Sequence, residues 1–198
     1  DGDLMLARGF SFFSAMISQI SDNVDHFSHT IIVSVKGNDV RTTESYVGDG
    51  VKNYEIHYAL KNENVRLIVL RPKDSALGKL AAVAALGAGD RRLLYDYQMN
   101  FDDDSQMSCV EVPSYSYKNA SQGKVKIPIT PDDLETDPRF DLILEWQDAR
   151  LIRDERQKDA VVREMLRWLN DLHYKFYDSP KAYAGMYVLL PLRQTPFW

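Results

Sequence analysis

Hydrophobic and polar residues alternate along the segment 26–35, HFSHTIIVSV, and this alternation predicts a β-strand. One face of the strand then carries Phe27, His29, Ile31, Val33 and Val35. The other face carries Ser28, Thr30, Ile32 and Ser34. The turn KGND follows, and VRTTESYV at 40–47 predicts a return strand, so the two segments form a β-hairpin.

Further segments of the chain predict three extended elements and three helices. The extended elements are NYEIHYAL at 53–60, VRLIVLR at 65–71 and KVKIPIT at 124–130. The helices are the apolar segment 10–20, the Ala- and Leu-rich segment 75–89 with glycine at its end, and a helix that starts at TPDDL, 130–134. In TPDDL, Thr130 can cap the helix, Pro131 suits its first turn, and Asp133 occupies the acidic position of a capping box.

From about residue 141 to 177 the pattern predicts helix, and we interpret its apolar stripe as core packing. The stripe consists of Val162, Met165, Leu166, Leu169, Leu172 and Phe176. The charged run ARLIRDERQKD is expected to be a solvated face. The order of elements predicts an α+β fold, mainly an antiparallel sheet packed with helices, in a domain at 1–140. Residues 141–198 are predicted to be a helical extension packed on that domain.

The composition bounds the class of protein. The chain has 198 residues, of which 44% are hydrophobic and 27% charged, so it can form a sizeable core. The net charge of −5 argues against sequence-independent nucleic-acid binding, and no apolar run is long enough for a membrane span. The chain begins with Asp1 rather than Met, and we favour a periplasmic or cell-envelope location, while nothing in it indicates an oligomeric state.

Cys109 is the only cysteine, so it cannot form an internal disulfide. It follows the polar loop DDDSQ, which can lead into a helix. A helix N-terminus lowers the pKa of a thiol, and the Cys109 backbone N–H could help to hold an oxyanion. In a helix that starts at Cys109, however, Pro113 would delete the first intrahelical hydrogen bond. Taken by itself, the cysteine is either an inert buried group or a nucleophile.

Four histidines are possible partners of this cysteine: His26, His29, His57 and His173. If Gly37 and Asn38 form a two-residue turn, residue 29 lies opposite Tyr46, and Glu44 is a diagonal neighbour of His29 on the same face. A carboxylate on this apolar face is costly to bury, and a histidine donor offsets part of the cost. The acid would in turn orient the imidazole, as in a catalytic triad. The other interpretation is a core histidine bonded to a buried acid, without chemistry.

Several motifs together resemble one protein family. They are GDLMLARG, FSHTIIV, ESYVGDGV, VLRP, YDYQMNFDDDSQMSCVEV and ITPDDLETDPRF, in this order over about residues 2–140. The chain thereby resembles the permuted papain-like amidases of the YaeF/YiiX kind, within the NlpC-type papain-like superfamily. The resemblance implies a circularly permuted papain-like fold. It implies a catalytic Cys109 in SCVEV, His29 in SHT and Glu44 in TES, the last two being the pair that the hairpin also selects.

The resemblance implies a cysteine hydrolase that cleaves an amide through an acyl-enzyme, acting on cell-wall peptide or on a lipid amide. Tyr46 and Tyr95 are candidates to line its substrate cleft. The chain shows no zinc-ligand spacing and no glycine-rich phosphate loop, so we expect neither a metal nor another cofactor. Val110 and Pro113 depart from the family motif, and they favour the alternative of a non-catalytic binding module.

Overall fold

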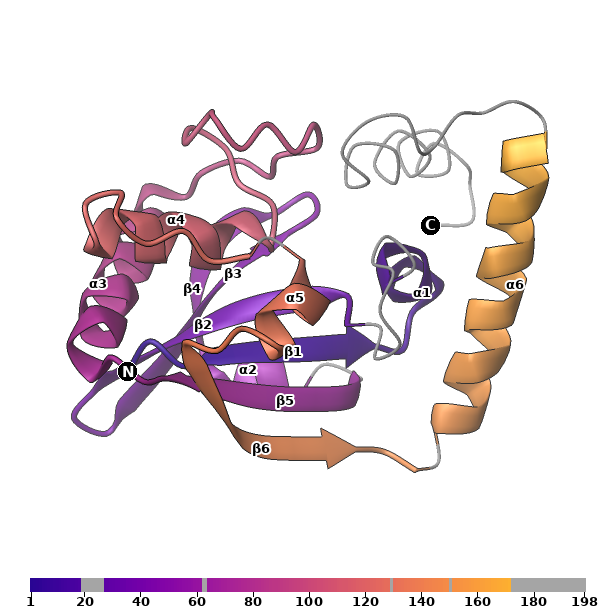
Figure 1. Ribbon diagram of the computed structural model, residues 1–198, viewed down its shortest axis with the longest axis horizontal. Helices are drawn as coiled ribbons and strands as arrows, with labels where there is room; N and C mark the ends of the chain where they lie inside the picture. Colours follow the sequence, from indigo (N-terminus) through magenta and orange to yellow (C-terminus); the bar gives the residue numbers. More distant parts are fainter. Residues whose placement is uncertain (19–26, 62–63, 129, 150, 172–198) are drawn as a thin grey trace.

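The computed structural model describes residues 1–18, 27–61, 64–128, 130–149 and 151–171, and it has the predicted α+β class (Figure 1). Its six-stranded antiparallel sheet has the strand order β4-β3-β2-β1-β5-β6. The strands are β1 (Leu4–Gly9), β2 (His29–Lys36), β3 (Asp39–Tyr46), β4 (Gly50–Glu55), β5 (Asn64–Pro72) and β6 (Phe140–Gln147). The helices are α1 (Phe12–Ser18), α2 (Ile56–Lys61), α3 (Ser75–Arg91), α4 (Glu111–Ala120), α5 (Pro131–Glu135) and α6 (Ile152–Asp171).

The hairpin of β2 and β3 has the register that its two-residue turn predicted. Lys36 pairs with Asp39, and Ile32 pairs with Thr43. Gly37 in the turn has a φ of +61°, which glycine adopts without the steric cost of a Cβ. A shift of one residue would have turned every side chain of the strand to the other face. The turn therefore decides which side chains of β3 share a face with His29.

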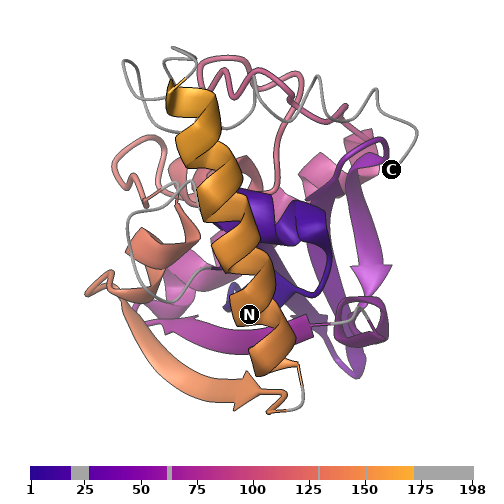
Figure 2. The ribbon, with the colours of Figure 1, turned by 90° about the vertical axis from the view of Figure 1, so that its right-hand side faces the viewer.

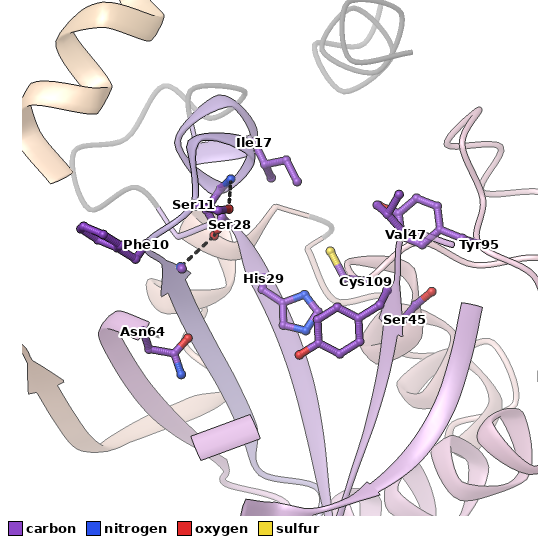
Figure 3. Close-up of a pocket in the computed structure, with 13 residues that line it drawn as sticks. Phe10, Ser11, Ile17, Ser28, His29, Ser45, Val47, Asn64, Tyr95 and Cys109 are labelled. Atoms are coloured by element: carbon purple, nitrogen blue, oxygen red, sulfur yellow. Dashed lines mark hydrogen bonds between the residues drawn. The ribbon is translucent and has the colours of Figure 1, made fainter. Parts of the chain in front are cut away.

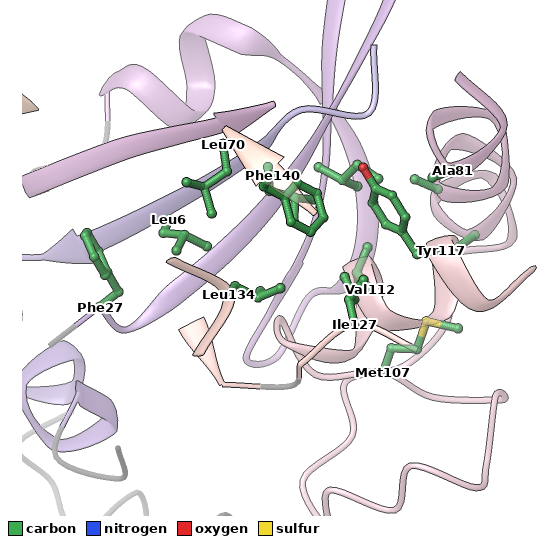
Figure 4. Packing of buried hydrophobic residues seen from close by; sticks show 14 of the residues in the cluster. Leu6, Phe27, Leu70, Ala81, Met107, Val112, Tyr117, Ile127, Leu134 and Phe140 are labelled. Atoms are coloured by element: carbon green, nitrogen blue, oxygen red, sulfur yellow. The ribbon is translucent and has the colours of Figure 1, made fainter. Parts of the chain in front are cut away.

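Different helices cover the two faces of the sheet. The main core lies under α3, α4 and α5, which contribute Ala81, Val112 and Leu134 (Figure 4). The opposite face carries a smaller apolar cluster with Ala59 of α2. Phe27 packs in the main core, so its predicted place on the His29 face is wrong. It precedes the first residue of β2, where the alternation of the strand no longer applies.

Helix α3 is longer than predicted, because its glycines do not end it. The helix begins after Asp74, whose side chain accepts the N–H groups of Ala76 and Leu77, and continues to Arg91. Gly89 lies inside the helix, where a Cβ would come within 2.1 Å of Oδ1 of Asn53. Glycine at this position thus permits close packing of α3 on β4 and is not a helix stop.

Helix α4 begins at Glu111, two residues after the cysteine, which removes the predicted conflict with Pro113. Pro113 is the third residue of the helix. The N–H groups of the first turn have no intrahelical partner, so proline deletes no hydrogen bond there. Val110 caps the helix in helical conformation and is buried. Neither departure from the family motif distorts the start of this helix.

One of the predicted strands is wrong over most of its length. In NYEIHYAL only residues 53–55 belong to β4, and the rest begins α2. Ile56 and Ala59 pack on the same face of the sheet, which is helical spacing. Residues 124–128 form no strand, although the side chain of Ile127 is buried. The predicted start of α5 is confirmed, since Oγ1 of Thr130 accepts the N–H of Asp133 at 3.2 Å.

The helix predicted from residue 141 is wrong in its first part, because residues 140–147 form strand β6. This strand extends the sheet by pairing with β5, from Phe140 opposite Pro72 to Gln147 opposite Arg66. All side chains of β6 except that of Phe140 are exposed. The sequence therefore lacks the alternation of apolar and polar residues that identifies a strand with one buried face. The predicted boundary after residue 140 therefore falls inside one strand, and the extension is not wholly helical.

Helix α6 lies along α1 at one end of the molecule (Figure 2). The prediction that its charged segment is a solvated face is wrong in part. Glu155 and Asp159 of this segment are buried beside Arg8 of β1. Nη2 of Arg8 donates to Oδ1 of Asp159 at 2.6 Å, and Nε of Arg66 donates to Oε2 of Glu155 at 3.3 Å. Buried charges require such partners.

Of the predicted apolar stripe of α6, Val162 is buried. The side chains of residues 165, 166 and 169 and all of residues 172 and 176 lie outside the described residues. Within the described chain, no helix is both long and apolar enough to cross a membrane.

Candidate active site

A pocket of about 400 Å³ opens beside α1, where β1 and β3 end and β2 begins (Figure 3). Its volume lies in the usual range for small-molecule sites. The described residues that line it are Gly9, Phe10, Ser11, Ser14, Ile17, Ser28, His29, Ser45, Tyr46, Val47, Asn64, Tyr95 and Cys109. The pocket therefore contains the predicted nucleophile, the predicted base and both predicted substrate-binding tyrosines.

The hairpin brings His29 and Glu44 together, as its register predicted. Nε2 of His29 lies 3.1 Å from Oε2 of Glu44. The carboxylate is completely buried, while the side chain of His29 is 16% exposed toward the pocket. Glu44 thus lies behind the imidazole and reaches the pocket only through it.

The Glu44 carboxylate accepts two further hydrogen bonds from its own strand. Oγ1 of Thr42 donates to Oε1 at 2.6 Å, and the Tyr46 hydroxyl donates to Oε2 at 2.7 Å. Burial by itself raises the pKa of Glu44. The hydrogen bond and the positive charge of His29, followed by the two hydroxyl donors, outweigh burial and hold the pKa below its usual value. The buried carboxylate is therefore ionised at neutral pH.

The His29 imidazole lies between Glu44 and Cys109. Burial lowers its pKa, but hydrogen bonds with the side chains of Cys109 and Glu44, and their charges, raise it from 6.5 to about 10. Because Nε2 faces Glu44, the other ring nitrogen, Nδ1, is the one available to the cysteine. Figure 3 shows the sulfur of Cys109 beside the ring, on the same side as the pocket. The arrangement favours the imidazolium form of His29.

Cys109 is held by hydroxyl groups on the face of the hairpin opposite to His29. Oγ1 of Thr30 donates to the carbonyl oxygen of Cys109 at 2.5 Å, and Oγ of Ser45 donates to that of Met107 at 2.5 Å. Only 4% of the cysteine is exposed. The same two strands therefore position the imidazole with one face and the cysteine loop with the other.

A side-chain hydrogen bond, which the sequence interpretation missed, fixes the turn that carries Cys109. In SCVE, the backbone N–H of Ser108 donates to Oε2 of Glu111 at 2.6 Å, just before the N-cap of α4 at Val110. The backbone N–H of Cys109 makes no hydrogen bond to any described residue.

Glu111 is buried, and so is the neighbouring carboxyl group of Asp96. Burial raises the pKa of Glu111, hydrogen bonds from Ser108 oppose this, and the charge and hydrogen bond of Asp96 raise the pKa further, to about 7. Asp96 also accepts the N–H groups of Gln98 and Asn100, at 2.7 and 2.6 Å. Asp96 and Glu111 thus place the loop that follows Tyr95 beside the cysteine turn. No sequence pattern indicated this long-range pair.

The structure brings both predicted substrate-binding tyrosines to the pocket. Tyr95 is 5% exposed, and burial, followed by the charge of Cys109, raises the pKa of its phenol well above 10. The ring of Tyr46 is stacked on that of His29, with 4.8 Å between centroids and 25° between planes. Their contact with substrate remains a prediction.

The other histidines do not join this site in the described structure. His57 is exposed and pairs with Glu55 at 2.9 Å, while His26 and His173 lie outside the described residues. Among the residues that the structure describes, no three histidine, cysteine, aspartate or glutamate side chains form a group that could hold a metal ion.

The fold and the pocket define an α+β protein with a cysteine, a histidine and a buried glutamate in one constellation. Comparison with solved structures finds a similar fold in the metalloprotein yiiX, DUF1105, from Escherichia coli O157:H7. The TM-score is 0.60 and the sequence identity 16%, over 74% of this chain and 97% of that chain. This likeness is consistent with the YiiX-like resemblance of the sequence, and at this identity it concerns the fold alone. No family model and no curated protein sequence matches the chain.

Proposed function

We propose that the protein is a cysteine hydrolase with a circularly permuted papain-like fold, cleaving an amide bond in a peptide or an N-acyl compound. One observation carries the proposal: the sole cysteine meets an imidazole whose other ring nitrogen lies 3.1 Å from a buried, ionised glutamate. Nucleophile, base and orienting acid in this order form the arrangement that activates a thiol for acyl transfer.

In the proposed reaction, Nδ1 of His29 holds the proton taken from the Cys109 thiol, which leaves a thiolate, and Glu44 stabilises this imidazolium through Nε2. The thiolate attacks the amide carbonyl carbon and forms a tetrahedral adduct. The adduct collapses as His29 protonates the leaving amine, which breaks the C–N bond and leaves a thioester. His29 then removes a proton from water, which attacks the thioester, and the acid product leaves as the thiol is restored.

The start of α4 would stabilise the oxyanion of each tetrahedral adduct. The Cys109 N–H has no hydrogen-bond partner among the described residues, so it can donate to the developing charge. The N-terminal end of the helix, which begins two residues later, adds a favourable field.

The pocket lining supports a neutral group beside the scissile bond. Apart from His29, the described residues that line it are apolar, aromatic, amide-bearing or hydroxyl-bearing, or are the cysteine itself. Hydroxyl and amide groups can bond to a peptide or N-acyl amide, while Phe10, Ile17 and Val47 offer apolar contact. Both expected substrate classes, cell-wall peptide and lipid amide, contain such bonds.

The test is a comparison of wild-type protein with Cys109→Ala and His29→Ala on a panel of peptide and N-acyl amides. We expect both variants to lose turnover while their circular dichroism spectra are unchanged, and a thioester on Cys109 to be trapped by mass spectrometry. Full activity of Cys109→Ala would refute the proposal.

The alternative of a non-catalytic binding module is decided by alkylation with iodoacetamide near neutral pH. An activated Cys109 is labelled faster than a free thiol, and His29→Ala slows the labelling. If the wild type is labelled slowly, and His29→Ala is labelled at the same rate, the result would favour the binding module. Pro113 and Val110, which suggested this alternative, fit the first turn and the N-cap of α4, respectively.

A further inference from the structure

We propose that Tyr46 is a positioning residue of the Cys109–His29–Glu44 site, and not a residue that binds substrate through its hydroxyl. The inference rests on the proposed function. Tyr46 contacts both members of the histidine–acid pair. Its hydroxyl donates to Oε2 of Glu44 at 2.7 Å, and its ring is stacked on the imidazole at a centroid distance of 4.8 Å.

The two contacts of Tyr46 restrict different motions. Oε2 of Glu44 accepts from both the Tyr46 hydroxyl and Nε2 of His29, so the hydroxyl holds the oxygen that orients the imidazole. The stacked ring opposes rotation of the imidazole out of the line between Glu44 and Cys109. A base held in this way spends more of its time in the geometry that proton transfer requires.

A substrate could recruit the Tyr46 hydroxyl only at the expense of Glu44. A phenol has one proton to donate, and in this structure that proton goes to a buried carboxylate. Releasing it would leave the carboxylate with one donor fewer in a water-poor environment, which is costly. The ring still forms part of the pocket wall, but the hydroxyl points to the acid behind the imidazole.

Tyr54 and Tyr58 complete an aromatic cover next to Tyr46. Both pack edge-on against its ring, at 5.9 and 6.1 Å, and stack on each other at 4.4 Å. The Tyr54 hydroxyl is buried without a hydrogen-bond partner among the described residues. Tyr54→Phe is therefore a matched control: it removes a hydroxyl from the same cluster without removing a donor to Glu44.

The direct test is a ¹³C NMR titration of the Glu44 carboxyl in wild type, Tyr46→Phe and Tyr54→Phe. Because Tyr46 stabilises the carboxylate, its loss should raise the pKa of Glu44 by about one unit, as expected for a hydrogen bond to a charged group. Tyr54→Phe should leave it unchanged. Equal titrations in wild type and Tyr46→Phe would overturn the inference, whether or not an amide substrate is found.

Steady-state kinetics provide the second readout. A positioning role predicts that Tyr46→Phe lowers kcat about tenfold with KM unchanged, since one hydrogen bond of the reacting groups is lost. A rise in KM with kcat unchanged would mean that the hydroxyl binds substrate, and would refute the inference. If the wild type cleaves no amide, the proposed hydrolase fails, while the titration still decides the role of Tyr46.

Discussion

Glu44 and Glu111 are both buried near Cys109, with exposed fractions of 0% and 6%, yet their pKa values move in opposite directions. Burial disfavours the charged form of each. Glu44 has three donors, including an imidazole that can carry a positive charge, so its pKa falls. Glu111 has a second carboxyl group, Asp96, beside it, so its pKa rises to about 7.

The difference shows that burial sets the cost of a charge, and the neighbouring groups decide whether the charge forms. Glu44 can hold an imidazolium in place because it is ionised. Glu111 lies beside Asp96, and this second carboxyl group keeps a proton on Glu111 to a higher pH. One site thus contains one acid with a lowered pKa and one acid with a raised pKa.

Removing the charge of Glu44 should have the largest effect. In Glu44→Gln the amide N–H groups point toward Thr42, Tyr46 or His29, which are themselves donors. We expect kcat/KM to fall about a hundredfold or more, because the proposed triad loses its orienting acid. The pKa of His29, measured by ¹⁵N NMR, should fall below about 10. An unchanged His29 titration would show that Glu44 does not stabilise the imidazolium.

Glu111→Gln should have an intermediate effect, on stability. Glutamine imitates the protonated acid, since its oxygen can accept from Ser108 while its N–H₂ donates to Asp96. The wild-type group has a native pKa above its ordinary 4.5, so the native state binds the proton more tightly than the unfolded chain. Its contribution to stability is present below about pH 4.5 and is lost as pH rises to about 7.

Urea unfolding at pH 5 and pH 8 measures this loss. Between these values the wild type should lose roughly 3 kcal/mol that Glu111→Gln retains. Groups that titrate equally in both proteins cancel in the difference. Parallel pH dependence of the two proteins would show that Glu111 is ionised throughout and that no proton links it to Asp96.

Thr42→Val should have the smallest effect. It tests how much a donor that does not touch His29 contributes to the lowered pKa of Glu44. Thr42 donates to Oε1 of Glu44, the oxygen that does not face His29. Its loss should raise the pKa of Glu44 by roughly half to one unit while the His29 ring keeps its position. Carboxyl ¹³C titration and the alkylation rate of Cys109 test the two parts. A large fall in alkylation rate would mean that both oxygens orient the ring.

The histidine–acid pair could be predicted because the hairpin that carries it is local. Gly37 and Asn38 fix the turn, the turn fixes the register, and alternation then puts Glu44 on the face of His29. The same reasoning could have placed Thr42 and Tyr46 as donors to Glu44.

Other features depend on partners far away in the chain. Asp159 appeared to belong to a solvated face because its partner, Arg8, is 151 residues away. Thr30 holds the Cys109 loop across 79 residues, and no periodic pattern indicates such a contact. Strand β6 has both faces exposed except at Phe140, so its residues lack the one-sided burial that makes a strand recognisable.

Arg8 gives helix α6 a significance beyond packing. The side chain of Arg8 is 1% exposed. In the sequence, Arg8 is followed directly by Gly9 and Phe10, which line the pocket. The anions that neutralise it, Asp159 and Glu155, are supplied by α6. Without this helix, a buried cation would lose its counter-charges next to the residues that line the pocket. Helix α6 thus supplies a built-in counter-ion to the strand end that leads into the pocket wall.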